Sequence, residues 1–101
     1  MRMLMKVILP NQPFNALAKK GKAGATIKRI LETIKPEAVY FTEENGKRGG
    51  VLVVDVPDAS KIPALSEPWF LAFEADVKFQ IAMTPADLEQ SALDTLGKKW
   101  G

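Results

Sequence analysis

The sequence contains no cysteine and no histidine, and these two absences exclude several classes of chemistry at once. Without cysteine there is no disulfide and no thiolate nucleophile, and without histidine there is no Ser-His triad and no imidazole general base. Almost every zinc site is excluded as well, because such sites use cysteine and histidine ligands. The acidic residues do not follow the spacing of a Ca²⁺-binding loop. We therefore expect that the protein needs no metal and no haem or other cofactor.

Long hydrophobic runs are also lacking. No stretch approaches the roughly 20 apolar residues that a transmembrane helix requires. The first nine residues resemble the start of a signal peptide, but Lys6 interrupts them, Pro10 ends them and no small-residue cleavage site follows. We expect no membrane association and, without cysteine or targeting signals, a cytoplasmic location.

The composition that remains is that of one globular domain spanning residues 1–101. Hydrophobic residues make up 47% of the chain and charged residues 26%, and the net charge is only +2. The charge is uneven, because residues 1–50 hold ten Lys and Arg against four Asp and Glu, whereas residues 51–101 hold four against eight. A basic half is typical of nucleic-acid-binding proteins. The small net charge favours another interpretation, in which the two halves neutralise each other within a chain or across a dimer.

Short β-rich segments bounded by proline, glycine or asparagine predict four strands. We expect them at residues 2–9, 37–43, 48–56 and 77–83. Between the second and third segments lies Asn45-Gly46, the strongest short-range signal for a two-residue hairpin.

Helical periodicity appears in three other segments. A helix is expected over residues 14–34, with a break near 20–24 where two glycines occur, and Pro36 follows its end. A second helix is expected over residues 58–73, with a kink or a division into two at Pro68. Thr84-Pro85 predicts the start of a last helix that runs to about Leu96 and stops at Gly97.

The resulting order is βαββαβ with an additional C-terminal helix, which predicts an α+β, ferredoxin-like domain. Right-handed crossovers place the first and third strands in the centre of a four-stranded antiparallel sheet. Both helices then cover one face, and the other face is left open. We expect functional residues on this open face.

Alternation along each strand assigns its side chains to the two faces. The residues expected on the helix side are Met3, Met5, Val7, Val39, Phe41, Leu52, Val54, Val56, Val77, Phe79, Ile81 and Met83. Those expected on the open face include Leu4, Lys6, Ile8, Tyr40, Val51, Val53, Asp55, Lys78 and Gln80. This set is too apolar for a surface in water and too polar for a dry core. Two sheets that meet face to face around a partly polar cavity would account for both properties.

Six short runs of the sequence carry a resemblance to known proteins. They are residues 36–43, 46–48, 53–55, 62–64, 67–68 and 83–88. With the element order and the two faces, they resemble the dimeric α/β-barrel superfamily, in which two ferredoxin-like sheets pair into a barrel, and within it a group of small uncharacterised bacterial proteins. The resemblance spans nearly the whole chain and brings no catalytic motif. It implies a homodimer formed through the open sheet face.

The superfamily includes enzymes similar to muconolactone isomerase, cofactor-free monooxygenases, haem proteins of the chlorite-dismutase type and ligand-binding modules. The absence of histidine argues against the haem enzymes and many of the monooxygenases. The resemblance therefore implies binding of a small anionic or aromatic molecule in a cavity between the sheets, with isomerase-like proton transfer as a related activity.

Five residues are candidates for contact with such a ligand. Lys6 and Asp55 are expected on the same face of adjacent central strands, where they would hold an anion or form a structural salt bridge. Tyr40 and Lys78 belong to the same face, and the Tyr40 hydroxyl would donate to a ligand or to the backbone. Arg48 is expected in a solvated charge cluster with the glutamates across the hairpin, or at the barrel mouth, where it would fix a carboxylate.

Two alternative functions belong to other classes of protein. RNA-binding modules of the RRM type share this fold but present stacking aromatics on the two central strands, and none is expected here, so we predict no nucleic-acid binding. A structural or interaction dimer without catalytic activity stays open.

The basic run 19–26 lacks the spacing of a phosphate-binding loop and is interpreted as a flexible loop. Trp100, next to the C-terminus, is expected to pack on something, such as a partner subunit.

Overall fold

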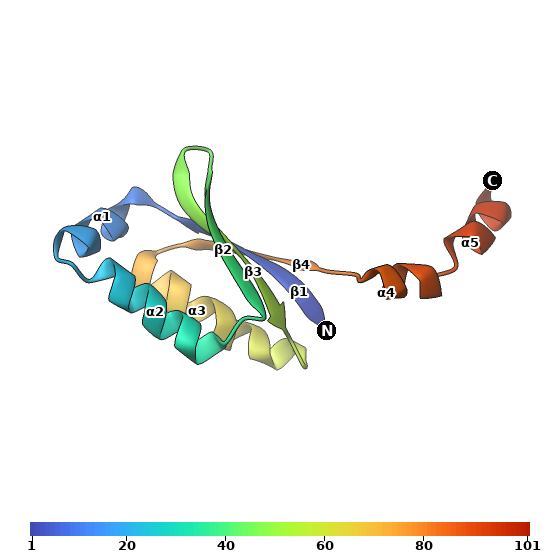
Figure 1. Ribbon diagram of the computed structural model, residues 1–101, viewed down its shortest axis with the longest axis horizontal. Coiled ribbons are helices and arrows are strands. Elements are labelled where there is room, and N and C mark those ends of the chain that lie inside the picture. The colour runs from blue at the N-terminus through green and yellow to red at the C-terminus, as the bar shows by residue number, and fades with distance from the viewer.

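A computed structural model that describes residues 1–101 has an α+β fold built on one antiparallel sheet (Figure 1). The four strands are β1 (Arg2–Leu9), β2 (Ala38–Glu44), β3 (Lys47–Asp55) and β4 (Asp76–Ile81). Their order is β2-β3-β1-β4, so β1 and β3 occupy the centre as predicted. This arrangement is compatible with a ferredoxin-like fold.

Three helices pack on one side of the sheet (Figure 1). They are α1 (Asn11–Lys19), α2 (Ala23–Ile34) and α3 (Ile62–Phe73), the last preceded by a short 3-10 turn, η1 (Ala59–Lys61). Their apolar side chains meet those of the central strands in one hydrophobic core. Its buried members include Met5, Val7 and Leu9 of β1, Leu52 and Val54 of β3, Ile30 of α2, and Trp69 and Phe73 of α3.

Local sequence signals determine the turns and the helix cap within residues 1–81. Asn45 and Gly46 both have positive φ, 53° and 77°, as the two-residue hairpin between β2 and β3 requires. The expected break in the first helical segment lies between α1 and α2, where Gly21 has a φ of 70°. Asp58 caps η1 by accepting a hydrogen bond of 3.0 Å from the backbone N–H of Ser60.

The division into two helices at Pro68, one of the two predicted alternatives, is wrong, because α3 continues through this residue as one helix. A proline inside a helix costs about 3 kcal/mol. Trp69 and Phe73, which follow it, have no exposed surface, and full burial of a large apolar side chain contributes roughly 1.5–3 kcal/mol. Packing on the sheet therefore holds the helix together across the proline.

Three side chains expected in the core are exposed instead. They are Phe41, Ile81 and Met83, with 51%, 65% and 66% of their surface accessible. Phe41 contacts Gly50, its partner across the β2–β3 ladder, and no helix covers it. Ile81 is the last residue of β4, and Met83 lies beyond that strand. Alternation assigned their face, but the helices do not extend far enough to bury them.

The last helix is divided in two, which corrects the prediction of one helix that stops at Gly97. The helices are α4 (Pro85–Gln90) and α5 (Leu93–Trp100), separated at Ala92, whose φ of 56° is left-handed, and Gly97 lies inside α5. Residues 82–101, here called the C-terminal arm, lead away from the sheet and the other helices (Figure 1). None of its residues is buried. Without a packing surface, nothing joins the two short helices into one.

Candidate functional site

The open face of the sheet is organised in rows of side chains that run across all four strands. The register aligns Tyr40 of β2, Val51 of β3, Lys6 of β1 and Lys78 of β4 in one row. The row on one side of it contains Ala38, Val53, Leu4 and Gln80. The row on its other side contains Thr42, Gly49, Ile8 and Asp76. These assignments agree with the alternation expected from the sequence. The central strands thus present mostly apolar groups, with Lys6 as the exception, and the outer strands β2 and β4 present most of the polar ones.

Two lysines lie directly opposite each other on this face. Lys6 of β1 pairs in register with Lys78 of β4, and neither ammonium group forms a salt bridge with a carboxylate. Like charges opposite each other on neighbouring strands are destabilising. Lys6 is half-buried, whereas Lys78 is exposed. The pair therefore places two cations side by side, and an anion between them would relieve their mutual repulsion.

A shallow depression of about 110 Å³ lies around these two lysines. The other residues that line it are Ile8, Glu44, Asp76 and Gln80. Of these, Glu44 was expected only in a charge cluster with Arg48, although it lies in step with Tyr40 and Thr42 on β2 and alternation therefore places it on the open face. The depression thus combines two ammonium groups with two carboxylates and one amide, which suits a small polar molecule that carries an anionic group and a hydrogen-bond donor.

The proposed pairing of Lys6 with Asp55 is wrong. Asp55 lies opposite Arg2 in the β1–β3 ladder, four residues away from Lys6 along the strand, or about 13 Å. Its Oδ1 accepts a hydrogen bond of 3.1 Å from the amino group of Met1. Alternation placed both side chains on the correct face but cannot supply the register between strands that a long connection separates.

Arg2, which faces Asp55, has its own partner at this end of the sheet. Its Nε donates a hydrogen bond of 2.8 Å to Oε2 of Glu37. This hydrogen bond, followed by the charge of the same carboxylate, raises the pKa of the Arg2 guanidinium. The group remains a cation throughout the usable pH range, so this end of the face is occupied by a structural ion pair.

Arg48 lies apart from the other candidates, on the helix side of the sheet. It is opposite Leu9, a core residue, and its guanidinium lies 4.3 Å above the centre of the Phe14 ring. Its Nη1 also donates a hydrogen bond of 2.8 Å to Oδ1 of Asn15. These two contacts attach the hairpin to α1. Glu43 lies opposite Arg48 in the β2–β3 ladder, as the expected cross-strand cluster requires, but no salt bridge joins Arg48 to Glu43 or Glu44. Arg48 is therefore not part of the open-face site.

Tyr40 belongs to the row of the two lysines but lies on the outer strand, β2. Two interstrand spacings separate it from Lys6, or about 10 Å, and 74% of its surface is accessible. No side chain of the same molecule covers its ring. The structure therefore brings together Lys6 and Lys78, places Tyr40 at the far side of the same face, and separates Asp55 and Arg48 from them.

Other features of the chain limit what the site can contain. The central strands β1 and β3 present no aromatic ring on the open face. No group of three or more acidic residues lies close enough together to hold a metal ion. None of the helices has both the length and the apolar character needed to cross a membrane.

Comparison with known proteins identifies no family whose model matches this chain, and no curated protein shows significant sequence similarity to it.

Proposed function

We propose that the protein is a ferredoxin-like domain of the dimeric α/β-barrel type, and that two copies pair through their open sheet faces to enclose a binding site for a small anionic molecule. The observation that carries the proposal is the Lys6–Lys78 pair, two cations in register on neighbouring strands with no carboxylate bound to either. A ligand carboxylate or phosphate between the two ammonium groups would replace their mutual repulsion by two charge-assisted hydrogen bonds.

The apolar residues of the open face support the pairing of two sheets. Leu4, Ile8, Val51 and Val53 are only partly covered in one chain. Burial of each such side chain contributes on the order of 1.5–3 kcal/mol. A second sheet would cover this row and would also remove the lysines from bulk water, where their attraction for an anion is weak.

The remaining polar groups would orient the ligand. Asp76 and Glu44 lie at the end of the depression, where their carboxylates would accept hydrogen bonds from a ligand hydroxyl or amine. Tyr40 and the apolar row would contact a flat or aromatic part of the molecule. The chemistry that the site supports is therefore recognition of a small acid.

The test uses benzoate, succinate and inorganic phosphate as probes, with benzyl alcohol as the neutral counterpart of benzoate. We expect at least one anion to raise the thermal midpoint of the wild type, and Lys6→Met and Lys78→Met to abolish the increase. Lys28→Met removes a cation of α2, away from the open face, and is the matched control, which should retain it. If the control loses the response equally, the effect is one of overall charge and the site is refuted.

The dimer is tested separately by sedimentation. Val53→Lys places a third cation on the apolar row and should raise the dissociation constant of the dimer, whereas a substitution on the helix side, Lys28→Glu, should not. A wild-type protein that sediments as a monomer at all accessible concentrations contradicts the pairing. A dimer that responds to none of the anions supports the alternative of a structural dimer without a ligand.

A further inference from the structure

The C-terminal arm has an apolar side that nothing in its own chain covers. Leu93, Leu96 and Trp100 follow one another at spacings of three and four residues, so they form one stripe along α5. Their accessible fractions are 54%, 43% and 79%. Leu88 of α4, with 43%, adds to the same exposed set. A helix with such a stripe is stabilised mainly by packing, which the isolated chain does not provide.

The area of the whole chain indicates how large the missing contact is. The accessible surface is 7142 Å², whereas a compact monomer of this mass is expected to have about 5,700 Å². The radius of gyration is 17.0 Å, against about 13 Å for a compact chain of this length. The excess area of the whole chain, about 1,400 Å², exceeds the roughly 800 Å² that each partner contributes to a standard protein interface. The uncovered surface, of which the arm is a part, is therefore large enough for a stable interface.

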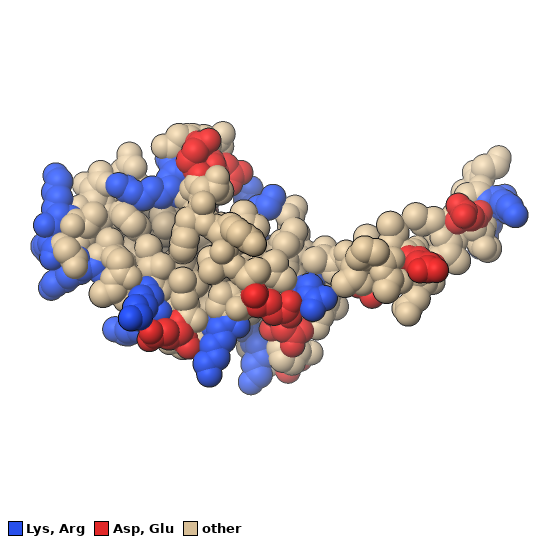
Figure 2. All heavy atoms as spheres, viewed as in Figure 1, with Lys and Arg blue, Asp and Glu red and all other residues tan.

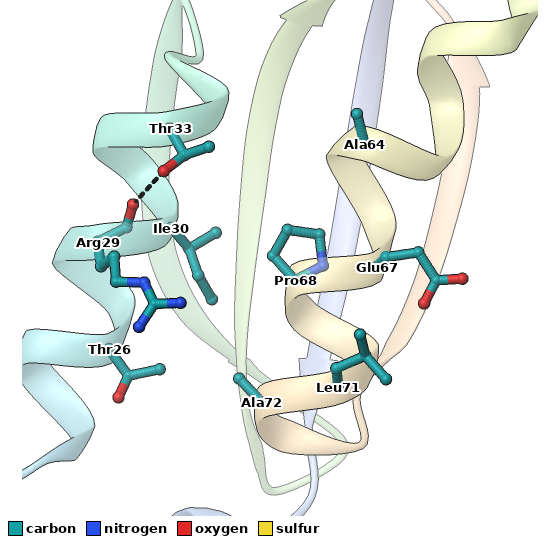
Figure 3. A pocket seen from close by; sticks show the side chains of 9 residues that line it. All are labelled: Thr26, Arg29, Ile30, Thr33, Ala64, Glu67, Pro68, Leu71 and Ala72. Carbon is teal, nitrogen blue, oxygen red and sulfur yellow. Dashed lines mark hydrogen bonds between the residues drawn. The ribbon is translucent and has the colours of Figure 1, made fainter.

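A groove on the helix side of the domain has the shape that such a helix requires. It lies between α2 and α3 and has a volume of about 560 Å³. Figure 3 shows Ile30 of α2 and Pro68 of α3 facing each other across it. Leu71 borders the groove with 81% of its surface accessible. Grooves with an apolar floor between two helices are typical binding sites for a third, amphipathic helix.

The charges of the groove and of the arm are complementary. The α2 side of the groove includes Arg29, with Lys22 and Lys28 close to it in the sequence, and the α3 side includes Glu67. The arm carries acidic residues first, Asp87, Glu89 and Asp94, and its two lysines at the end, Lys98 and Lys99. In Figure 2 basic side chains gather at the end of the domain formed by α1 and α2, while acidic ones lie along the arm.

The local geometry directs the arm away from the groove of its own chain. The backbone N–H of Thr84 donates to Oδ2 of Asp87 at 2.9 Å, and the N–H of Asp87 donates to Oγ1 of Thr84 at 3.1 Å. This capping box, with Pro85 at the first helical position, fixes the start of α4 directly after β4. Figure 1 shows that the arm continues outward from β4, away from α2 and α3.

We propose that the arm of one chain binds in the α2–α3 groove of a second copy, and that the second copy returns its own arm to the first. Each chain has one arm and one groove, so a two-fold pair satisfies both surfaces and leaves neither exposed. Leu93, Leu96 and Trp100 occupy the apolar floor, and Asp94 lies on the basic α2 side. This exchange is carried by the helix side of the domain and does not rest on the proposed ligand site.

The absence of cysteine from the chain provides a clean test by cross-linking. The variant Ala72→Cys places a thiol in the groove, and Leu96→Cys places one on the apolar side of α5. With both substitutions in one full-length chain, mild oxidation at micromolar concentration should give a covalent dimer. A control chain with Leu96→Cys and Lys47→Cys, which moves the second thiol to the β2–β3 hairpin, should give at least tenfold less.

Each of the other outcomes overturns the exchange. A cross-link within one chain, seen as a compact monomer, means that the arm folds back on its own groove. A ladder of higher oligomers means that the contacts do not close in pairs, and no cross-link above the hairpin control means that the groove is not the acceptor.

A second measurement distinguishes this interface from the pairing of sheets. Iodide should quench Trp100 fully in dilute protein and at least threefold less at a concentration where the protein is dimeric, while the buried Trp69 stays protected throughout. When Val53→Lys is added to the chain with Ala72→Cys and Leu96→Cys, the cross-link between positions 72 and 96 should persist, because the exchanged arms hold the pair without the sheets. Its loss in that chain, together with unchanged quenching of Trp100, assigns the dimer to the sheets and refutes the exchange.

Discussion

Residues 1–81 and the C-terminal arm follow the same local rules of helix formation but differ in the contacts that stabilise their helices. All buried side chains belong to the first region, between Met5 and Ala75, and the arm contributes none. In the first region α3 continues through Pro68 because Trp69 and Phe73 pack on the sheet. In the arm, which has no proline beyond the first turn of a helix, the chain still breaks at Ala92. Capping residues decide where a helix begins, whereas packing decides whether it continues.

The largest difference between the two regions is expected when one apolar side chain is removed from each. Leu52 has no exposed surface, and Leu52→Ala should lower the free energy of unfolding by about 2–5 kcal/mol. Leu96→Ala, a matched change in the arm, should alter it by less than about 0.5 kcal/mol in dilute monomeric protein. Urea denaturation followed by the fluorescence of Trp69 measures both. Equal losses would mean that the arm is part of the folding unit of a single chain.

Glycine substitutions test the backbone of residues 1–81 in two directions. Gly46 has a φ of 77° in the hairpin, so Gly46→Ala should cost about 1–2 kcal/mol of stability. Gly24 lies inside α2 with no atom within 4 Å of an added Cβ, so Gly24→Ala should instead stabilise by about 0.4–1 kcal/mol. The difference in thermal midpoint, measured by circular dichroism, should have opposite sign for the two variants. A loss of stability in Gly24→Ala would contradict the position of α2.

A glycine-to-alanine substitution in the C-terminal arm should change the stability of the arm alone. Gly97 lies within α5 and an added Cβ would contact nothing, so Gly97→Ala should favour the local helix by about 1 kcal/mol or less. We expect slower amide hydrogen exchange over residues 93–100 and an unchanged midpoint for residues 1–81. If the midpoint rises in step with α5, the arm and the domain unfold together and the contrast between them is lost.

The sequence was sufficient where one local signal determines the structure. The hairpin at Asn45-Gly46, the break before α2 and the cap at Thr84 were predicted because a turn or a cap depends on a few adjacent residues. The two faces of the sheet followed from alternation in the same way. These signals placed Lys6, Tyr40 and Lys78 on one face without any knowledge of the register.

Features that depend on distant contacts could not be predicted. The β1–β3 register, which separates Lys6 from Asp55, is set by the whole sheet and not by any one turn. The exposure of Phe41 and Ile81 depends on how far the helices extend over the strands. Arg48 was expected among charges, but its position opposite Leu9 points it to α1, where it contacts Phe14 and Asn15. In each case the missing information is the packing of elements remote in the sequence.

The smallest expected effect is a pH dependence of the helical structure in the arm, which arises from the capping box at the start of α4. Hydrogen bonds from Thr84, first that of its backbone N–H, hold the pKa of Asp87 below its ordinary value of about 3.9. A carboxylate whose folded pKa is depressed contributes stability that is present above the ordinary value and is lost as the pH falls through the folded pKa. The helical signal of the arm should therefore decrease on acidification below about pH 4.

The matched variants are Asp87→Asn and Asp94→Asn. Asp87→Asn should remove the acid-induced change at the start of α4, as followed by the amide shifts of residues 85–90. Asp94→Asn, a loss of the same charge in the first turn of α5, leaves the box intact and should preserve it. Because no residue of α4 is buried, the domain of residues 1–81 should not respond to either substitution. An acid transition in the domain that disappears in Asp87→Asn would show that the cap stabilises more than the arm.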